Sequence, residues 1–194
     1  MTAETTIVDA IMSPAERLEV GPMVADLDTS QWPMELDTAR YWSQEFADLE
    51  RDRLWPHTWQ IACHESEVPE PGYWFEYKLL DQSYLVVRGN DGCIRAFINA
   101  CRHRGNALCE GHGHSARLTC PFHLWQFELD GRLRKISDEA EEFPGRDKSK
   151  LGLLPVRTSV FGGFVFINPD PDAPSLDDYL GPDVRALLEP YRME

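Results

Sequence analysis

Hydrophobic and polar residues alternate over short distances through the middle of the chain. Four segments between residues 58 and 99 are rich in aromatic and β-branched residues, namely TWQIAC, YWFEYKLL, SYLVVR and CIRAFIN. Asn90-Asp91-Gly92 separates two of them and is typical of a hairpin turn, and Asp130-Gly131 and Gly162-Gly163 punctuate later segments in the same way. The pattern predicts a mostly β fold, a small antiparallel sandwich or barrel.

A helical period precedes these segments. Asp37 is a candidate cap for a helix through TARYWSQEFADLERDRLW, in which Trp42, Phe46 and Leu49 fall at helical spacing. This stripe predicts a helix face that packs against the rest of the fold. Residues 1–36 show weak periodicity, which is typical of an extended arm or a loosely held tail.

Composition and charge narrow the class of protein. The chain has 194 residues, of which 42% are hydrophobic, and no apolar run approaches the roughly eighteen residues of a membrane-spanning helix. A formal net charge of -14 argues against nucleic acid and against an anionic membrane surface as partners. The N-terminus has no secretory signal, so we expect a cytoplasmic protein. Five cysteines, an odd number, make a disulfide framework improbable.

Two short segments each carry one cysteine and one histidine. Cys101 and His103 directly follow one predicted strand, and Cys120 and His123 directly precede the next. Both pairs therefore belong to loops at strand ends, where binding residues are usually found. Residues two apart in an extended loop project to the same side, and Pro121 bends the second loop, so we expect the four side chains to converge.

Several kinds of site use these residue types. A zinc ion can be bound by two cysteines and two histidines, although in zinc fingers the two cysteines are usually close together in the sequence and so are the two histidines. A nucleophilic cysteine with a histidine base would leave the other pair idle. An iron–sulfur cluster of the Rieske type takes two thiolates on one iron and two imidazoles on the other, which two mixed loops would supply. Structural zinc therefore stays open as an alternative to the cluster.

The two loops and their flanks resemble the Rieske domain of ring-hydroxylating oxygenase large subunits. The resemblance is carried by CRHRG at 101–105 and CPFHLWQFELDG at 120–131, and it extends outward to residues 37–181. It implies a Rieske-type antiparallel β-sandwich with a small cluster-binding subdomain, preceded by an N-terminal arm and a helix. We accordingly expect an arm over 1–36, the Rieske domain with its leading helix over 37–181, and a helical stub over 182–194.

The resemblance also implies the roles of the four side chains. Cys101 and Cys120 would bind one iron of a single 2Fe–2S cluster, and His103 and His123 would bind the other. Most family members have glycine after the second histidine, where this chain has Leu124. We expect that change to alter the local backbone and not the ligation.

Two further expectations concern the surroundings of the loops. Rieske proteins of respiratory chains add a cysteine to each loop, where this chain has Asn106 and Phe122, so we expect a potential in the lower part of the range of about -150 to +300 mV. Residues 101–135 hold six basic and three acidic residues. This excess, with Arg102 and Arg104 beside His103, predicts a basic collar that docks an acidic electron donor. Both arginines could instead tie the loops together by hydrogen bonds.

Family oxygenases also carry a catalytic domain with one iron on two histidines and a carboxylate. No histidine follows His123, so we expect mononuclear Fe(II) only in a catalytic domain that is absent here. The resemblance implies an oxidoreductase component that passes electrons from a ferredoxin or reductase to a catalytic oxygenase domain or subunit of an aromatic-hydrocarbon dioxygenase. The chain is not expected to oxygenate substrate alone. A standalone Rieske ferredoxin-like protein is the alternative, and a homo-oligomer is possible in either case.

Overall fold

A computed structural model describes residues 37–137 and 143–188. The arm expected over 1–36 lies outside these residues. All the strands of the described residues lie after Ala39. No helix within the described residues has the length and apolar character needed to cross a bilayer.

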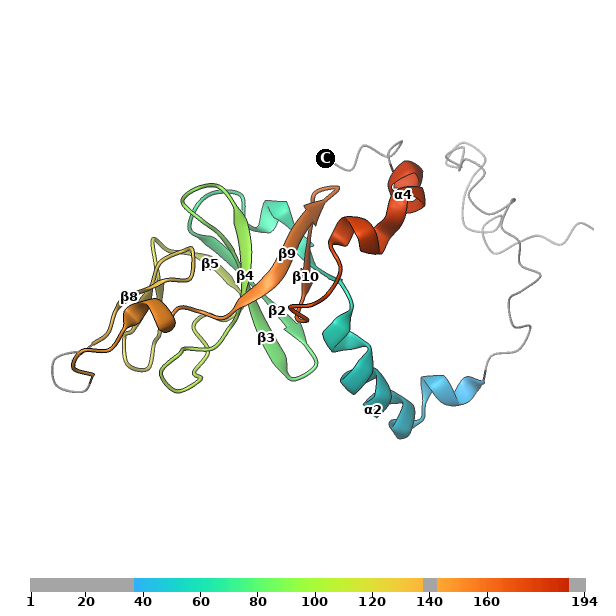
Figure 1. The fold of residues 1–194 in the computed structure, drawn as a ribbon, viewed down its shortest axis with the longest axis horizontal. Coiled ribbons are helices and arrows are strands. Elements are labelled where there is room, and N and C mark those ends of the chain that lie inside the picture. The colour runs from blue at the N-terminus through green and yellow to red at the C-terminus, as the bar shows by residue number, and fades with distance from the viewer. Residues whose placement is uncertain (1–36, 138–142, 189–194) are drawn as a thin grey trace, which may run out of the picture. The chain divides into compact units, whose positions relative to one another are not determined.

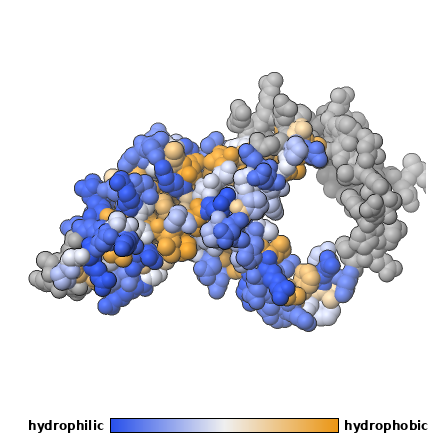
Figure 2. Space-filling model, in the orientation of Figure 1, coloured by the Kyte–Doolittle hydropathy of each residue, from blue (hydrophilic) through white to orange (hydrophobic). Residues whose placement is uncertain are grey.

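The helix before the strands begins later than the sequence pattern predicted. Residues Thr38–Tyr41 form a short 3-10 helix (η2), and helix α2 spans Gln44–Arg53. Ser43 caps α2, because its hydroxyl accepts a hydrogen bond from the amide of Phe46 at 3.3 Å. The predicted packing stripe is wrong for the part of the chain described here: α2 has no buried residue, Trp42 is 77% exposed, and Figure 2 shows apolar atoms at the surface along the helix.

The mostly β, antiparallel fold with a small second sheet is confirmed (Figure 1). Seven strands form one sheet in the order β1-β10-β9-β4-β3-β2-β5, and three form another in the order β6-β7-β8. The larger sheet consists of β1 (Gln60–His64), β2 (Tyr73–Leu79), β3 (Gln82–Arg88), β4 (Ile94–Ile98), β5 (His112–His114), β9 (Pro155–Phe161) and β10 (Phe164–Asn168). The smaller sheet consists of β6 (Leu118–Thr119), β7 (Gln126–Phe127) and β8 (Leu133–Lys135).

Short helices complete the described chain. Three are single 3-10 turns, η3 (Trp55–His57), η4 (Glu65–Glu67) and η5 (Lys148–Lys150). Helix α4 spans Leu176–Leu188 and is interrupted at Gly181, whose φ of 69° and ψ of 172° are not helical. Pro182 follows directly, so α4 consists of two helical pieces.

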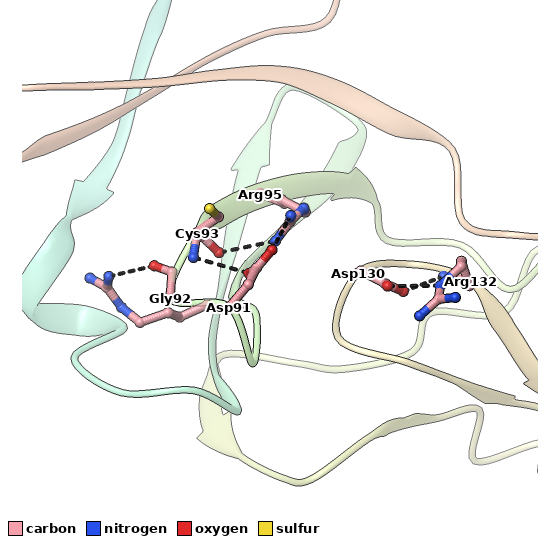
Figure 3. Close-up of polar contacts among 7 residues, drawn as sticks. Asp91, Gly92, Cys93, Arg95, Asp130 and Arg132 are labelled. Carbon is pink, nitrogen blue, oxygen red and sulfur yellow. Dashed lines mark hydrogen bonds and ion pairs between the residues drawn. The ribbon is translucent and has the colours of Figure 1, made fainter.

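All three hairpins predicted from turn residues are present. The turns join β3 to β4, β7 to β8 and β9 to β10. In the first, an Asp91 carboxylate oxygen accepts a hydrogen bond from the amide of Cys93 at 3.1 Å (Figure 3). Asp130 accepts one from the amide of Arg132, also at 3.1 Å. Each aspartate thereby replaces a backbone acceptor at the tip of its hairpin.

Two hydrophobic cores lie on opposite faces of β3. Tyr84 and Val86 pack into a core formed by the larger sheet, the sheet core, which also contains Ala62, Cys63, Val68, Ala96, Val156, Val165 and Ile167. Leu85 and Val87 point the other way, as alternation along a strand requires. They pack into the loop core, whose other buried members are Phe97, Cys101, Leu108, Leu118, Cys120, Trp125, Phe127, Leu129, Leu133, Ile136 and Leu153. The loop core underlies the two segments that carry cysteine and histidine.

Candidate metal centre

The first ligand loop follows β4 and is closed by its own backbone. The amide of Cys101 donates to the carbonyl of Asn106 at 2.8 Å, and the amide of Gly105 donates to the carbonyl of Cys101 at 2.8 Å. The amides of His103 and Arg104 also donate hydrogen bonds to the Cys101 sulfur. These bonds place the cysteine at the base of the loop and His103 at its tip.

The second ligand loop repeats this pattern. The amide of Cys120 donates to the carbonyl of Trp125 at 2.9 Å, and the amide of Leu124 donates to the carbonyl of Cys120 at 3.0 Å. The residue four positions after each cysteine has a positive φ, 74° at Gly105 and 59° at Leu124. Glycine adopts this conformation freely and leucine does not. The family's glycine at this place thus has a backbone reason, and Leu124 keeps the same turn.

The loops bring the four predicted ligands together in like pairs. The thiols of Cys101 and Cys120 are buried and share a hydrogen bond. Burial, with this bond as a further cause, raises the pKa of Cys101 to about 11. The rings of His103 and His123 meet edge to face, with centroids 4.5 Å apart at 68°.

This pairing fits the donor set of a two-iron cluster. Such a cluster needs two sulfur donors at one iron and two imidazoles at the other. Tetrahedral zinc needs four donors around one ion. The described residues hold no group of three or more His, Cys, Asp or Glu side chains placed around a single ion.

An aromatic wall encloses His103. The indole of Trp125 stacks on the imidazole at 4.9 Å and 8°, and Phe143 meets both rings edge-on at 5.4 Å. Trp125 is also a buried member of the loop core, so the same ring packs the core and covers His103. Phe143 was not predicted as part of the site, because it lies in a polar stretch of the sequence. The available signal was an aromatic residue directly before the turn residues Pro144 and Gly145.

The side of His123 is open and apolar. The ring of Phe122 lies 3.9 Å from that imidazole, and Phe122 and Leu124 are 60% and 58% exposed. Arg102 and Arg104 of the first loop are also exposed. Neither arginine side chain makes an ion pair or hydrogen bond with a residue that the structure describes, so the alternative of tying the loops together gains no support.

The predicted basic collar is narrower than the sequence suggested. Arg132 pairs with Asp130 at 2.8 Å, and Arg134 pairs with Glu128 at 2.7 Å. Arg117 also approaches Glu128, at 4.0 Å. Three of the six basic residues of this stretch therefore have an acidic partner within 4.0 Å, and two of the three share the carboxylate of Glu128.

The other cysteines differ in their surroundings. Cys63 is buried, Cys109 is partly buried and packs against the loop core, and Cys93 is exposed at a hairpin. His112 and His114 are exposed and belong to strand β5.

Comparisons with known proteins agree with the geometry. The family model for the Rieske [2Fe-2S] domain matches residues 58–155. The chain is 34% identical over 165 residues to biphenyl 2,3-dioxygenase subunit alpha of Rhodococcus jostii, covering 82% of this chain and 36% of that protein. It is 37% identical over 144 residues to the carnitine monooxygenase oxygenase subunit of Escherichia coli K12, covering 73% and 38%. A crystal structure of the quaternary ammonium Rieske monooxygenase CntA superposes with a TM-score of 0.71 at 31% identity, covering 78% and 42%. The chain spans about a third of the length of these curated relatives.

Proposed function

The chain belongs to the Rieske [2Fe-2S] domain family, and from this premise we propose that it is the electron-transfer domain of an oxygenase. In this proposal Cys101 and Cys120 hold one iron of a 2Fe–2S cluster, and His103 and His123 hold the other. The observation that carries the proposal is the meeting of thiol with thiol and imidazole with imidazole between two loops of equal backbone pattern.

Each part of the site has a task in this function. When bound, the cluster supplies a centre that gains and loses one electron at a time. The amides of His103 and Arg104 donate to the Cys101 sulfur and so stabilise negative charge there. Trp125 and Phe143 exclude water from the buried side of His103. His123, half-buried under Phe122, provides the side through which a partner is reached.

The open side also supports the choice of partners. Arg102 and Arg104 offer exposed positive charge on the first loop, and the second loop exposes two apolar side chains, which suits an acidic ferredoxin or reductase as electron donor. The electron acceptor is a mononuclear iron in a catalytic oxygenase domain or subunit. An aromatic substrate for that oxygenase stays part of the proposal; similarity covers both an aromatic dioxygenase subunit and a quaternary ammonium monooxygenase.

Metal analysis and electron paramagnetic resonance test the ligand assignment. The wild type should contain two irons and two acid-labile sulfides per chain and give a signal when reduced. Cys101→Ser and Cys120→Ser should lose iron and signal, whereas Cys63→Ser, a matched buried cysteine of the sheet core, should retain both. A colourless wild type with one zinc would overturn the proposal in favour of structural zinc.

Reduction kinetics test the docking side. The double variant Arg102→Glu with Arg104→Glu should slow second-order reduction by an acidic ferredoxin about tenfold at low salt, and the difference should shrink at high salt. Arg53→Glu, which changes an exposed arginine at the end of α2, is the control and should leave the rate unchanged. Equal rates in the double variant and the control would refute this docking surface.

A further inference from the structure

A buried amide fastens the far end of the first ligand loop. Asn99 directly follows β4, and its side-chain oxygen accepts hydrogen bonds from the amides of Leu108 and Cys109 at 3.0 and 3.3 Å. Its side-chain nitrogen donates to the carbonyl of Cys109 at 2.7 Å. One side chain thus closes a ring between residues 99 and 109, and the ring contains Cys101.

A carboxylate and a hydroxyl extend this contact to the sheet. The Asn99 side chain also donates to the hydroxyl of Ser83 at 2.9 Å, and that hydroxyl donates to Glu76 at 2.7 Å. The second carboxylate oxygen of Glu76 accepts from the amide of Gly111 at 2.8 Å. The direction of each bond follows from chemistry, because an ionised carboxylate only accepts. The chain of contacts runs from β2 through β3 to both ends of the loop.

Burying the carboxylate of Glu76 at this place costs free energy, which suggests a role for it. The Glu76 side chain is 6% exposed, and burial of a charge is unfavourable without hydrogen bonds. Burial acts to raise its pKa, but the bonds from Gly111 and Ser83 hold the pKa of Glu76 below its ordinary value. Lys78 approaches it at 3.5 Å. The charge is therefore compensated by two hydrogen bonds and by Lys78.

We propose that Glu76, Ser83 and Asn99 are positioning residues that hold the first ligand loop in the conformation that binds iron. The inference rests on the proposed function. Between β4 and β5 the chain from residue 99 to 111 has no strand or helix, and the side-chain contacts of Asn99 and Glu76 add to the backbone hydrogen bonds that order it. The loop supplies one ligand to each iron in the proposed assignment. Displacing it would loosen both irons at once.

The rate of iron release to a chelator tests this role. Changes in the partners that support metal ligands typically cost about 10–100-fold in metal affinity. Ser83→Ala removes the central hydroxyl, and Glu76→Gln places an amide where two donors point. Both should bleach the visible spectrum about tenfold faster than wild type in chelator. Ser83→Thr keeps a hydroxyl and should restore the wild-type rate.

Thr158→Val is the matched control. The Thr158 hydroxyl also makes two hydrogen bonds, at 2.9 Å from the amide of Ala96 and at 2.9 Å to the carbonyl of Val156, but it joins β4 to β9 away from the ligand loops. The Thr158→Val variant should have a lower melting temperature. Its rate of iron release to the chelator and the g values of its electron paramagnetic resonance spectrum should equal those of the wild type. If Ser83→Ala and Glu76→Gln behaved like this control in a loaded protein, the inference would be overturned and the proposed function would stand. A wild type without iron and sulfide would overturn both.

Discussion

Replacing Leu124 by glycine and by alanine separates the backbone cost of the second ligand loop from its side-chain contacts. Leu124 has a φ of 59°, and its side chain is more than half exposed. Both replacements remove nearly the same contacts. The difference between them therefore reports how strongly the loop requires a left-handed backbone.

The magnitude follows from two opposing terms. A residue other than glycine in the left-handed region lowers the free energy of unfolding by about 1–2 kcal/mol, and glycine avoids this cost. Glycine in turn costs about 0.4–1 kcal/mol through the entropy of the unfolded chain. At position 124 the variant Leu124→Gly should thus be about 1 kcal/mol more stable than Leu124→Ala.

Phe122 provides the internal control. It is exposed to a similar extent in the same loop but has no positive φ. There the order should reverse, with Phe122→Gly about 0.4–1 kcal/mol less stable than Phe122→Ala. Urea denaturation followed by circular dichroism resolves these differences, because 1 kcal/mol moves the midpoint by roughly 0.5 M. A Leu124→Gly variant that is less stable than Leu124→Ala would refute the left-handed assignment.

Three further predictions concern packing, pH and potential. Gly131→Ala places a new carbon 2.5 Å from the ring of Phe97 and should lower the free energy of unfolding by about 1–3 kcal/mol, more than Gly145→Ala, which meets nothing within 4 Å. The hydrogen bond from His57 lowers the pKa of Asp170 in the folded state, so its stabilisation is present above pH ~3.9 and is lost as pH falls through the lowered pKa. The difference in urea midpoint between wild type and Asp170→Asn should accordingly be larger at pH 7 than below pH ~3. A redox titration should give a potential in the lower part of the range of about -150 to +300 mV, and a value above about +200 mV would contradict the expectation from the loops.

Local chemistry explains what could be predicted from the sequence. The hairpins at Asn90-Asp91-Gly92 and Asp130-Gly131 were predicted correctly because a turn depends on a few adjacent residues. The two ligand loops lie at strand ends, as predicted, because the strands beside them have a clear apolar pattern. The assignment of the four ligands themselves stays a prediction.

Contacts between distant residues explain what could not. Glu76 lies in strand β2, where a charged residue is expected to face solvent, yet its carboxylate contacts the amide of Gly111, which is 35 residues away. Nothing near Glu76 in the sequence indicates that contact. The start of α2 was missed for a different reason: Asp37 and Ser43 are both good caps, and the hydrophobic period fits either.

Strand β3 is covered on both sides, by the sheet core and by the loop core. Unfolding of β3 would expose both cores to solvent. The end of the domain that carries the two loops is therefore expected to unfold together with the sheet and not before it. Disordering of the two loops, by oxidation or by a chelator, would then destabilise the whole domain. A protease would accordingly cleave the unfolded chain and leave the folded domain intact.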